Sequence, residues 1–234
     1  MGRGWVHGVR VAAAAKKGKI FTKIAKEITV SVKIMGPNPE SNPRLRSALK
    51  EAQKNSVPRD TVDRAIKRGT GEGNEANFEE VTYEGYGPHG VAVIVDSLTD
   101  NRNRTVQDLR AAFVRGGGNL GEAGSVQWMF ERVSLIFAKY PKGQVDAEEA
   151  AILAGANEVS PLEETGEFAF FGAPNDLDSI QKALTDAGWE IEKGELSFKA
   201  KTPTPLDEAQ EKDLQDFLEL VNDNDDVKKV YLSL

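Results

Sequence analysis

Residues 16–68 hold the feature that most constrains the fold: apolar residues recur there at helical spacing beside rows of cations. In a helical projection of the first segment, one half of the wheel is apolar and consists of Ile20, Phe21, Ile24, Ala25, Ile28 and Val32. The other half is basic and consists of Lys16, Lys19, Lys23, Lys26 and Lys33, interrupted by Val30. The pattern predicts an amphipathic helix over residues 19–35 whose lysines, including Lys19, Lys23 and Lys26, face solvent.

Two shorter helices are predicted after it. Asn42-Pro43 is a start signal, with Asn at the cap and Pro at the first helical position. The second of these helices opens near Pro58 and stops at Gly69, a residue type favoured just past a helix end. The three helices can cover one another's apolar faces, which predicts a small three-helix bundle with a strongly cationic outside.

Charge divides the chain into a basic head and an acidic body. Residues 1–70 hold 16 Lys and Arg against 5 Asp and Glu, whereas residues 71–234 hold 14 against 32. This asymmetry indicates a polyanionic partner for the head. An alternative interpretation remains open, in which the head docks on the acidic body of the same chain.

The remaining composition narrows the chemistry. The chain has no cysteine and its two histidines, His7 and His89, are far apart, so we expect no disulfide, no metal site and no cofactor. No nucleophile, base and acid stand in a catalytic pattern, so we expect a protein that is not an enzyme. No apolar run approaches the roughly twenty residues of a membrane span, and we expect a cytoplasmic protein.

The hydrophobic period changes after a glycine-rich linker at residues 69–77. Strands are expected at residues 80–86, 91–95, 125–130, 133–138, 167–171, 195–201 and 227–232. Helices are expected from near Thr99 to Gly116, at 146–154, at 176–187, and from a capping-box-like Thr204-x-x-Asp207. These elements predict an α+β protein whose N-terminal three-helix bundle is followed by two small ferredoxin-like α/β domains.

Two loops could be mistaken for ligand sites. The glycine-rich run 116–124 follows a helix and lacks the Lys-Ser/Thr of a phosphate loop, so we interpret it as a tight helix-to-strand connection. The turn Asp100-Asn101-Arg102-Asn103-Arg104 is interpreted as a helix cap with its arginines paired to nearby acids. A small anion-binding patch at this turn remains an alternative.

The basic rows favour binding to a phosphate backbone, with an affinity that falls steeply as salt rises. Lysine-dominated contacts position a protein on nucleic acid and do not read its sequence. Trp5 could stack on a base or anchor the N-terminal arm. The candidate nucleic-acid-binding residues are Lys16, Lys17, Lys19, Lys23, Lys26, Arg44, Arg46, Lys50, Arg59, Arg64, Lys67 and Arg68.

Several motifs in order along the chain resemble the YebC/PmpR family. They are Lys19-Ile20-Phe21-Thr22-Lys23, Asn42-Pro43-Arg44-Leu45-Arg46, Pro58-Arg59-Asp60 through Gly69-Thr70-Gly71, Tyr83 to Pro88, Leu98 to Thr105, and Gly117 to Val126. Bacterial members of that family are described as probable transcriptional regulators, and relatives such as mitochondrial translational activators act at the ribosome. The N-terminus departs from the family, because Arg3-Gly4-Trp5 precedes an apolar segment where the family has more cations.

The resemblance implies three domains, with the third inserted in the second. These would be residues 1–76, residues 77–131 together with 204–234, and the insert 132–203. It also implies nucleic-acid binding through the basic helical domain, as a DNA-binding transcriptional regulator. The alternative is a translation factor that binds ribosomal RNA or tRNA at the ribosome, and a third hypothesis is an adaptor whose acidic body binds a basic protein. No small-molecule substrate is expected.

Overall fold

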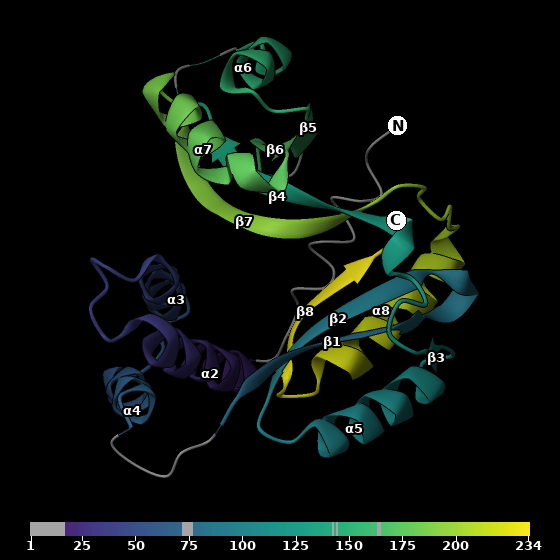
Figure 1. Ribbon diagram of the computed structural model, residues 1–234. Helices are drawn as coiled ribbons and strands as arrows, with labels where there is room; N and C mark the ends of the chain where they lie inside the picture. Colours follow the sequence, from purple (N-terminus) through teal and green to yellow (C-terminus); the bar gives the residue numbers. More distant parts are fainter. Residues whose placement is uncertain (1–16, 72–76, 142, 144, 163–164) are drawn as a thin grey trace. The chain divides into compact units, whose positions relative to one another are not determined.

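The computed structural model describes residues 17–71, 77–141, 143, 145–162 and 165–234 (Figure 1). Within them the chain forms two compact units. The first consists of residues 17–126 and Leu206–Val230, and the second of Gln127–Pro205 and Tyr231–Leu234. Lys16 and Trp5, for which the sequence suggests roles, lie outside the described residues, as does the side chain of Lys17.

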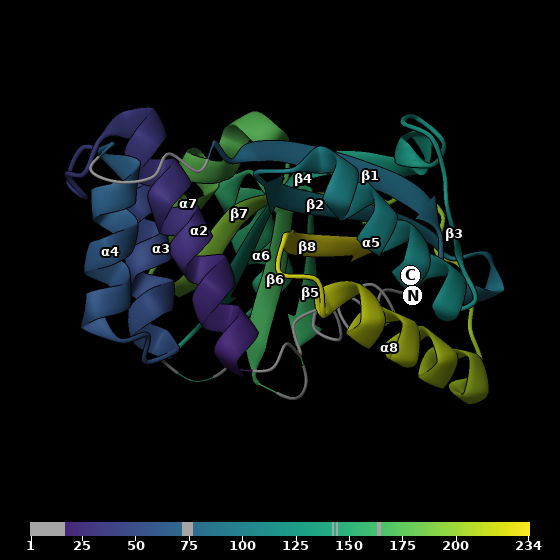
Figure 2. The same cartoon turned by 90° about the horizontal axis from the view of Figure 1, so that it is seen from below.

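The first unit begins with three helices: α2 (Lys17–Met35), α3 (Pro43–Lys54) and α4 (Arg59–Gly69). Helices α3 and α4 both pack against α2 (Figure 2). Asn42 caps α3, since its Oδ1 atom accepts a hydrogen bond from the backbone N–H of Leu45 at 2.9 Å. The shared core is made of Ile24, Ile28, Val32, Leu45, Ala48, Ala52 and Ala65. The predicted helical bundle is therefore confirmed.

Gly69 has a different role from the one the sequence suggested. It is the last residue of α4, and the left-handed backbone just past this helix belongs to Gly71, with φ of +86°. A Cβ atom on Gly69 would lie 2.5 Å from Cβ of Val32 and 2.7 Å from the carbonyl oxygen of Thr29. Glycine is needed at this position because α4 approaches the backbone of α2 too closely for a side chain.

The variant Gly69→Ala is therefore expected to destabilise the protein. The added methyl group overpacks the contact between α2 and α4, where the nearest atoms are backbone and a β-branched side chain. We expect the free energy of unfolding to fall by about 2 kcal/mol. Urea denaturation of the full chain measures this loss. Gly71→Ala, where a Cβ atom has nothing within 4 Å, is the control that isolates backbone strain from overpacking.

The rest of the first unit is a sheet covered by two helices. The strands β1 (Glu79–Tyr86), β2 (Ala92–Thr99), β3 (Asn119–Leu120) and β8 (Val227–Leu232) lie in the order β3-β1-β2-β8. Helices α5 (Arg102–Arg115) and α8 (Glu208–Asn222) lie together on one side of the sheet (Figure 1). They meet at Phe113 and Phe217, whose ring centroids are 4.9 Å apart in an edge-to-face arrangement.

The second unit repeats this architecture with different strands. Its sheet has the order β5-β6-β4-β7, made of β4 (Phe130–Lys139), β5 (Glu158–Leu162), β6 (Glu167–Gly172) and β7 (Glu190–Ala200). Helices α6 (Ala147–Ala154) and α7 (Leu177–Asp186) cover it (Figure 1). Its core includes Ile136, Phe170, Ile180 and Trp189. The predicted α+β class, a helical region followed by two small α/β units, is confirmed. No described helix is long and apolar enough to span a membrane.

The strand predicted at residues 125–130 is wrong. Short 3₁₀ turns connect other elements at Pro88–Gly90 and Pro174–Asp176, and a third one, Gln127–Met129, occupies this segment before β4 begins. The backbone N–H groups of Gly124 and Val126 donate to the carboxylate of buried Glu84, at 2.8 and 2.9 Å. Because a side chain takes these donors, the segment does not join a strand ladder.

One strand and one helix cap also differ from the expectation. Strand β5 was not predicted. It contains Pro161, which cannot donate to a ladder, and it lies at the edge of its sheet, where proline is tolerated. The capping box of α8 begins three residues later than expected: the side chains of Asp207 and Gln210 accept bonds from each other's backbone N–H groups, at 2.9 and 3.0 Å. Thr204 instead pairs with Ser233, its backbone N–H donating to the Ser233 carbonyl at 2.8 Å.

Candidate nucleic-acid interface

Lys19, Lys23 and Lys26 form the lysine row of α2 and are partly covered, whereas Lys33 near the end of the helix is exposed. Val30, which interrupts this row in the sequence, is only 5% exposed, so the basic side of the helix is covered as well as the apolar side. The cover comes from the C-terminal end of α8 and the turn that follows it. The expectation that Lys19, Lys23 and Lys26 project freely into water is therefore wrong.

The three ammonium groups bind oxygen atoms at the end of α8. Nζ of Lys23 donates to the Asn222 carbonyl at 2.9 Å, and Nζ of Lys26 donates to the Asp225 carbonyl at 3.0 Å. Lys19 donates to the carbonyl of Asp223 and pairs with its carboxylate. A helix C-terminus leaves carbonyl groups unsatisfied and carries partial negative charge, and α8 has no basic residue in its own last turn. Helix α2 supplies the missing cations.

Lys23 is enclosed by the contact with α8. Burial lowers the pKa of its ammonium group to about 8, while the nearby carboxylate of Asp225 acts in the opposite direction. Neighbouring Lys19 and Lys26 add to the lowering. A lysine placed to hold a fully solvated phosphate chain would keep its ordinary pKa, so this environment reflects the packed contact with α8.

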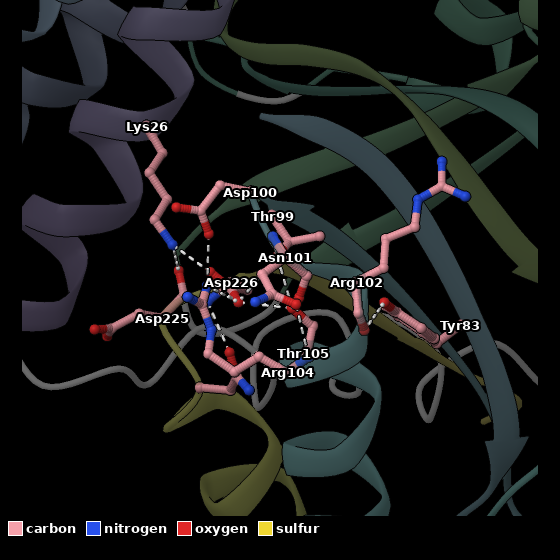
Figure 3. A network of polar contacts seen from close by, with 11 residues as sticks. Lys26, Tyr83, Thr99, Asp100, Asn101, Arg102, Arg104, Thr105, Asp225 and Asp226 are labelled. Atoms are coloured by element: carbon pink, nitrogen blue, oxygen red, sulfur yellow. Dashed lines mark hydrogen bonds and ion pairs between the residues drawn. The ribbon is translucent and has the colours of Figure 1, made fainter. Parts of the chain in front are cut away.

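Asp226 anchors the same contact from the other side (Figure 3). Its side chain is 4% exposed and accepts bonds from Lys26 at 2.5 Å and from Nη2 of Arg104 at 2.9 Å. Two threonine hydroxyls complete the shell, Thr105 at 2.7 Å and Thr99 at 3.2 Å. The network joins α2, the end of β2, the first turn of α5 and the turn before β8.

The pKa of Asp226 is lowered to about 2 by this environment. Burial alone would raise the pKa, but hydrogen bonds from Lys26, Arg104 and Thr105 outweigh burial. Because the folded-state pKa lies below the usual 3.8, the carboxylate contributes stability above pH 4 that is lost as pH falls towards 2.

We therefore expect the free energy of unfolding to decrease from pH 4 to pH 2, and this decrease to be smaller in Asp226→Asn. Urea denaturation series of both proteins across this pH range measure the difference. Identical pH profiles for the two proteins would show that the Asp226 carboxylate does not stabilise the fold.

The turn at residues 100–104 forms the helix cap that the sequence predicts. Asn101 accepts a bond from the backbone N–H of Arg104 at 3.1 Å. Arg102 pairs with Glu79, and Arg104 bonds both Asp100 and Asp226. Both arginines are thus neutralised by acids of the same unit, and the alternative of an anion-binding patch receives no support from their contacts.

Arg44 is also paired within the first unit. Its guanidinium binds Glu27 at 2.6 Å and also pairs with Glu80, while Lys228 binds Glu27 at 3.0 Å. Burial of Glu27 opposes ionisation, but the bonds from Arg44 and Lys228 lower its pKa overall. Arg44 therefore joins α3 to α2 and β1, and its charge is matched by acids. The sequence had placed it among the exposed cations.

The other six candidates that the structure describes project from α3 and α4 into solvent. They are Arg46, Lys50, Arg59, Arg64, Lys67 and Arg68. The apolar seam of each helix packs on α2, and this leaves the cations outside. Lys54 follows Lys50 by one helical turn and is exposed too, although the sequence analysis did not include it among the candidates. These seven side chains are the outer cation set.

Few acids oppose the outer cation set. Residues 43–71 contain eight Lys and Arg against three Asp and Glu. Arg59 is 93% exposed and its distance to Asp63 is 3.9 Å, the limit of an ion pair. Arg64 bonds the carbonyl of Asp60, and Arg46 bonds the carbonyls of Pro39 and Glu40. Within the described residues, Lys50, Lys54, Lys67 and Arg68 form no ion pair. Their charges are available to an external anion.

The outer cation set has the chemistry to bind phosphates. Exposed Lys and Arg on short helices bind backbone phosphates without distinguishing bases. No group of three His, Asp or Glu residues in the described parts of the chain could hold a metal ion. The absence of a metal or cofactor in the protein itself stays a prediction.

The acids that cover the lysine row were not predicted from the sequence. Asp223, Asn224, Asp225 and Asp226 follow directly after Asn222, the last residue of α8. An acidic run at a helix C-terminus is unfavourable unless cations lie nearby, and this is a signal that could have indicated a partner within the chain. The alternative in which the basic head docks on acidic residues of the same chain therefore describes the contact between α2 and the end of α8.

The fold and the outer cation set define an α+β protein with a cationic helical head, and comparisons with known proteins agree. A family model described as the TACO1/YebC protein N-terminal domain matches residues 5–72, and one described as the TACO1/YebC second and third domain matches residues 78–234. The chain belongs to the TACO1/YebC family, as its motifs suggested.

Relatives cover nearly the whole chain. A probable transcriptional regulatory protein of Bdellovibrio bacteriovorus is 50% identical, with all of both chains covered. One of Geobacter sulfurreducens is 43% identical, covering 94% of this chain and 88% of its own. The crystal structure of a conserved hypothetical protein from Aquifex aeolicus has a TM-score of 0.79 at 39% identity, covering 94% of this chain and 90% of its own.

Proposed function

We propose that this protein is a non-enzymatic nucleic-acid-binding regulator of transcription that contacts the phosphate backbone of DNA through the outer cation set. The observation that carries the proposal is the group of Lys50, Lys54, Lys67 and Arg68, four exposed cations on α3 and α4 without an ion pair among the described residues. The names of the relatives support the regulatory role. We also propose a cytoplasmic location.

The proposed contact positions the protein and does not read sequence. The outer cation set is made of Lys and Arg, which neutralise phosphates and release counterions. Binding should therefore be similar on DNA duplexes of different sequence and should weaken strongly as salt rises. Any preference for particular sites would come from DNA shape or from another protein.

The experiment that tests the proposal compares two kinds of target. The full-length protein is titrated with a labelled mixed-sequence DNA duplex in a gel-shift assay, and in parallel it is sedimented with purified ribosomes. We expect salt-sensitive binding to the duplex. Ribosome sedimentation without duplex binding would replace the proposal by the translation-factor alternative. Binding to neither would favour an adaptor for a basic protein.

We further propose the three-domain organisation of residues 1–76, 77–131 with 204–234, and 132–203. It is supported by the sheet order, because β8 shares a sheet with β1 and β2 although the strands of the second unit's sheet lie between them in the chain. If the proposal holds, a chain in which a short linker replaces residues 132–203 should still fold cooperatively. An unfolded product would count against it.

A further inference from the structure

We propose that the acidic turn Asn222–Asp226 competes with nucleic-acid phosphates for the lysine row of α2, so that docking of the turn restrains binding. This inference rests on the proposed function and adds a mode of regulation to it. The turn presents backbone carbonyls of Asn222 and Asp225 to Lys23 and Lys26, at 2.9 and 3.0 Å. It also presents the carboxylates of Asp223 and Asp226, which pair with Lys19 and Lys26.

The turn offers the lysines the same chemistry as a phosphate strand. Ammonium groups bind oxygen acceptors without strict geometry, and a row of phosphates presents such acceptors at regular intervals. Here the end of α8 supplies successive oxygen groups from Asn222, Asp223, Asp225 and Asp226 to lysines that lie along one side of α2. The two partners cannot occupy one ammonium group fully at the same time.

The strength of the contact changes along the row. In the Lys26–Asp226 pair the side chains are 15% and 4% exposed, and two threonines and Arg104 hold the carboxylate in place. In the Lys19–Asp223 pair they are 31% and 62% exposed. Exposed ion pairs are weak and screened by salt, whereas removal of a buried partner is costly. Exchange therefore begins at Lys19 and reaches the more enclosed Lys23 next, while Asp226 keeps the helices docked.

In this proposal the outer cation set binds nucleic acid constantly, and the lysine row binds it only conditionally. The outer cations bind phosphates in every state of the protein. Lys19 and Lys23 become available when the turn lifts from them, which extends the phosphate contact along α2. A ligand or partner that captured the acidic turn would thereby raise the affinity for nucleic acid.

The test uses the variant Asp223→Asn/Asp225→Asn, which keeps Asp226 and its network. Its affinity for a labelled mixed-sequence DNA duplex is compared with that of Asp108→Asn/Asp216→Asn, which removes two exposed carboxylates from α5 and the middle of α8. Both variants gain the same net charge, so any general electrostatic effect is shared. We expect the turn variant to bind about fivefold more tightly than the control variant.

Two results would overturn the inference. One is equal affinity of the turn variant and its charge-matched control. The other is a fivefold gain that persists when Lys19 and Lys23 are both changed to Gln, because the gain must act through these lysines. Unfolding curves of each variant verify that the protein remains folded.

A separate readout distinguishes this inference from the proposed function. Amide hydrogen exchange in the last turn of α8 should accelerate in Asp223→Asn/Asp225→Asn without any nucleic acid, and in the wild-type protein when duplex is added. If the wild-type protein binds the duplex while amide hydrogen exchange in the last turn of α8 stays unchanged, the proposed competition is wrong but the proposed function stands. Absence of duplex binding by every variant would remove both.

Discussion

Replacing Asp226 by Ala is expected to lower the free energy of unfolding by about 3 kcal/mol. The substitution removes the acceptor that Lys26, Arg104 and two threonine hydroxyls share, and it leaves Lys26 largely buried beside uncompensated positive charge. Both halves of the first unit lose a common partner, since Lys26 belongs to α2 and Arg104 to α5. Urea denaturation followed by circular dichroism measures the effect.

Asp225→Ala is the matched control for this experiment. Asp225 is adjacent in the chain, carries the same charge and is exposed, and its bond to Lys26 comes from the backbone carbonyl, which the substitution retains. We expect a change within about 0.5 kcal/mol. Similar losses in the two variants would mean that the buried network does not hold the α2 contact together.

Neutralising four residues of the outer cation set is expected to have the largest effect on binding. The variant Lys50→Gln/Lys54→Gln/Lys67→Gln/Arg68→Gln removes four exposed charges without altering any apolar contact of the bundle core. If each cation neutralises one phosphate, the affinity for a DNA duplex should fall roughly 1,000-fold in about 0.1 M salt. A fluorescence anisotropy titration measures the change.

The second unit provides a control of equal composition. Lys139, Lys182, Lys193 and Arg132 are exposed, and their replacement by Gln changes the net charge by the same amount. We expect this variant to lose little affinity, because long-range attraction between exposed charges is screened by salt. An equal loss in both variants would attribute binding to overall charge, with no defined surface on α3 and α4.

The local features of the helical region could be predicted from the sequence. Asn42 and Pro43 define the start of α3 through local chemistry, and Leu45, Ala48 and Ala52 recur at helical spacing, so each helix and its buried face follow from residues close in sequence. The exposure of Lys50, Lys67 and Arg68 follows in the same way, because no other part of the chain that the structure describes covers that side of α3 or α4.

The environment of the α2 lysines could not be predicted in this way. A helical projection shows which residues share a side of a helix, but it does not show what another part of the chain places against that side. The partners of Lys19, Lys23 and Lys26 lie about two hundred residues away in the sequence, at the end of α8. Val30 was the local sign, since an apolar residue among the lysines indicates a second buried side.

The same limit explains the misassigned segments. Residues 125–130 have strand-forming composition, but the backbone N–H groups of Gly124 and Val126 donate to the carboxylate of the distant Glu84. Gly69 was expected just past the helix end because glycine is common there. In the structure it lies in α4, and its lack of a side chain lets α4 approach α2 closely. In each case a contact between residues far apart in the chain decided the conformation.

The most direct test of the phosphate contact on α3 and α4 is the salt dependence of duplex binding. The logarithm of the association constant is plotted against the logarithm of salt concentration for the wild-type protein and for the variant with Lys50, Lys54, Lys67 and Arg68 changed to Gln. Each neutralised phosphate contributes about 0.9 to the slope, so the variant should have a slope shallower by about 3 to 4. Parallel lines for the two proteins would contradict the assignment of these four side chains to the interface.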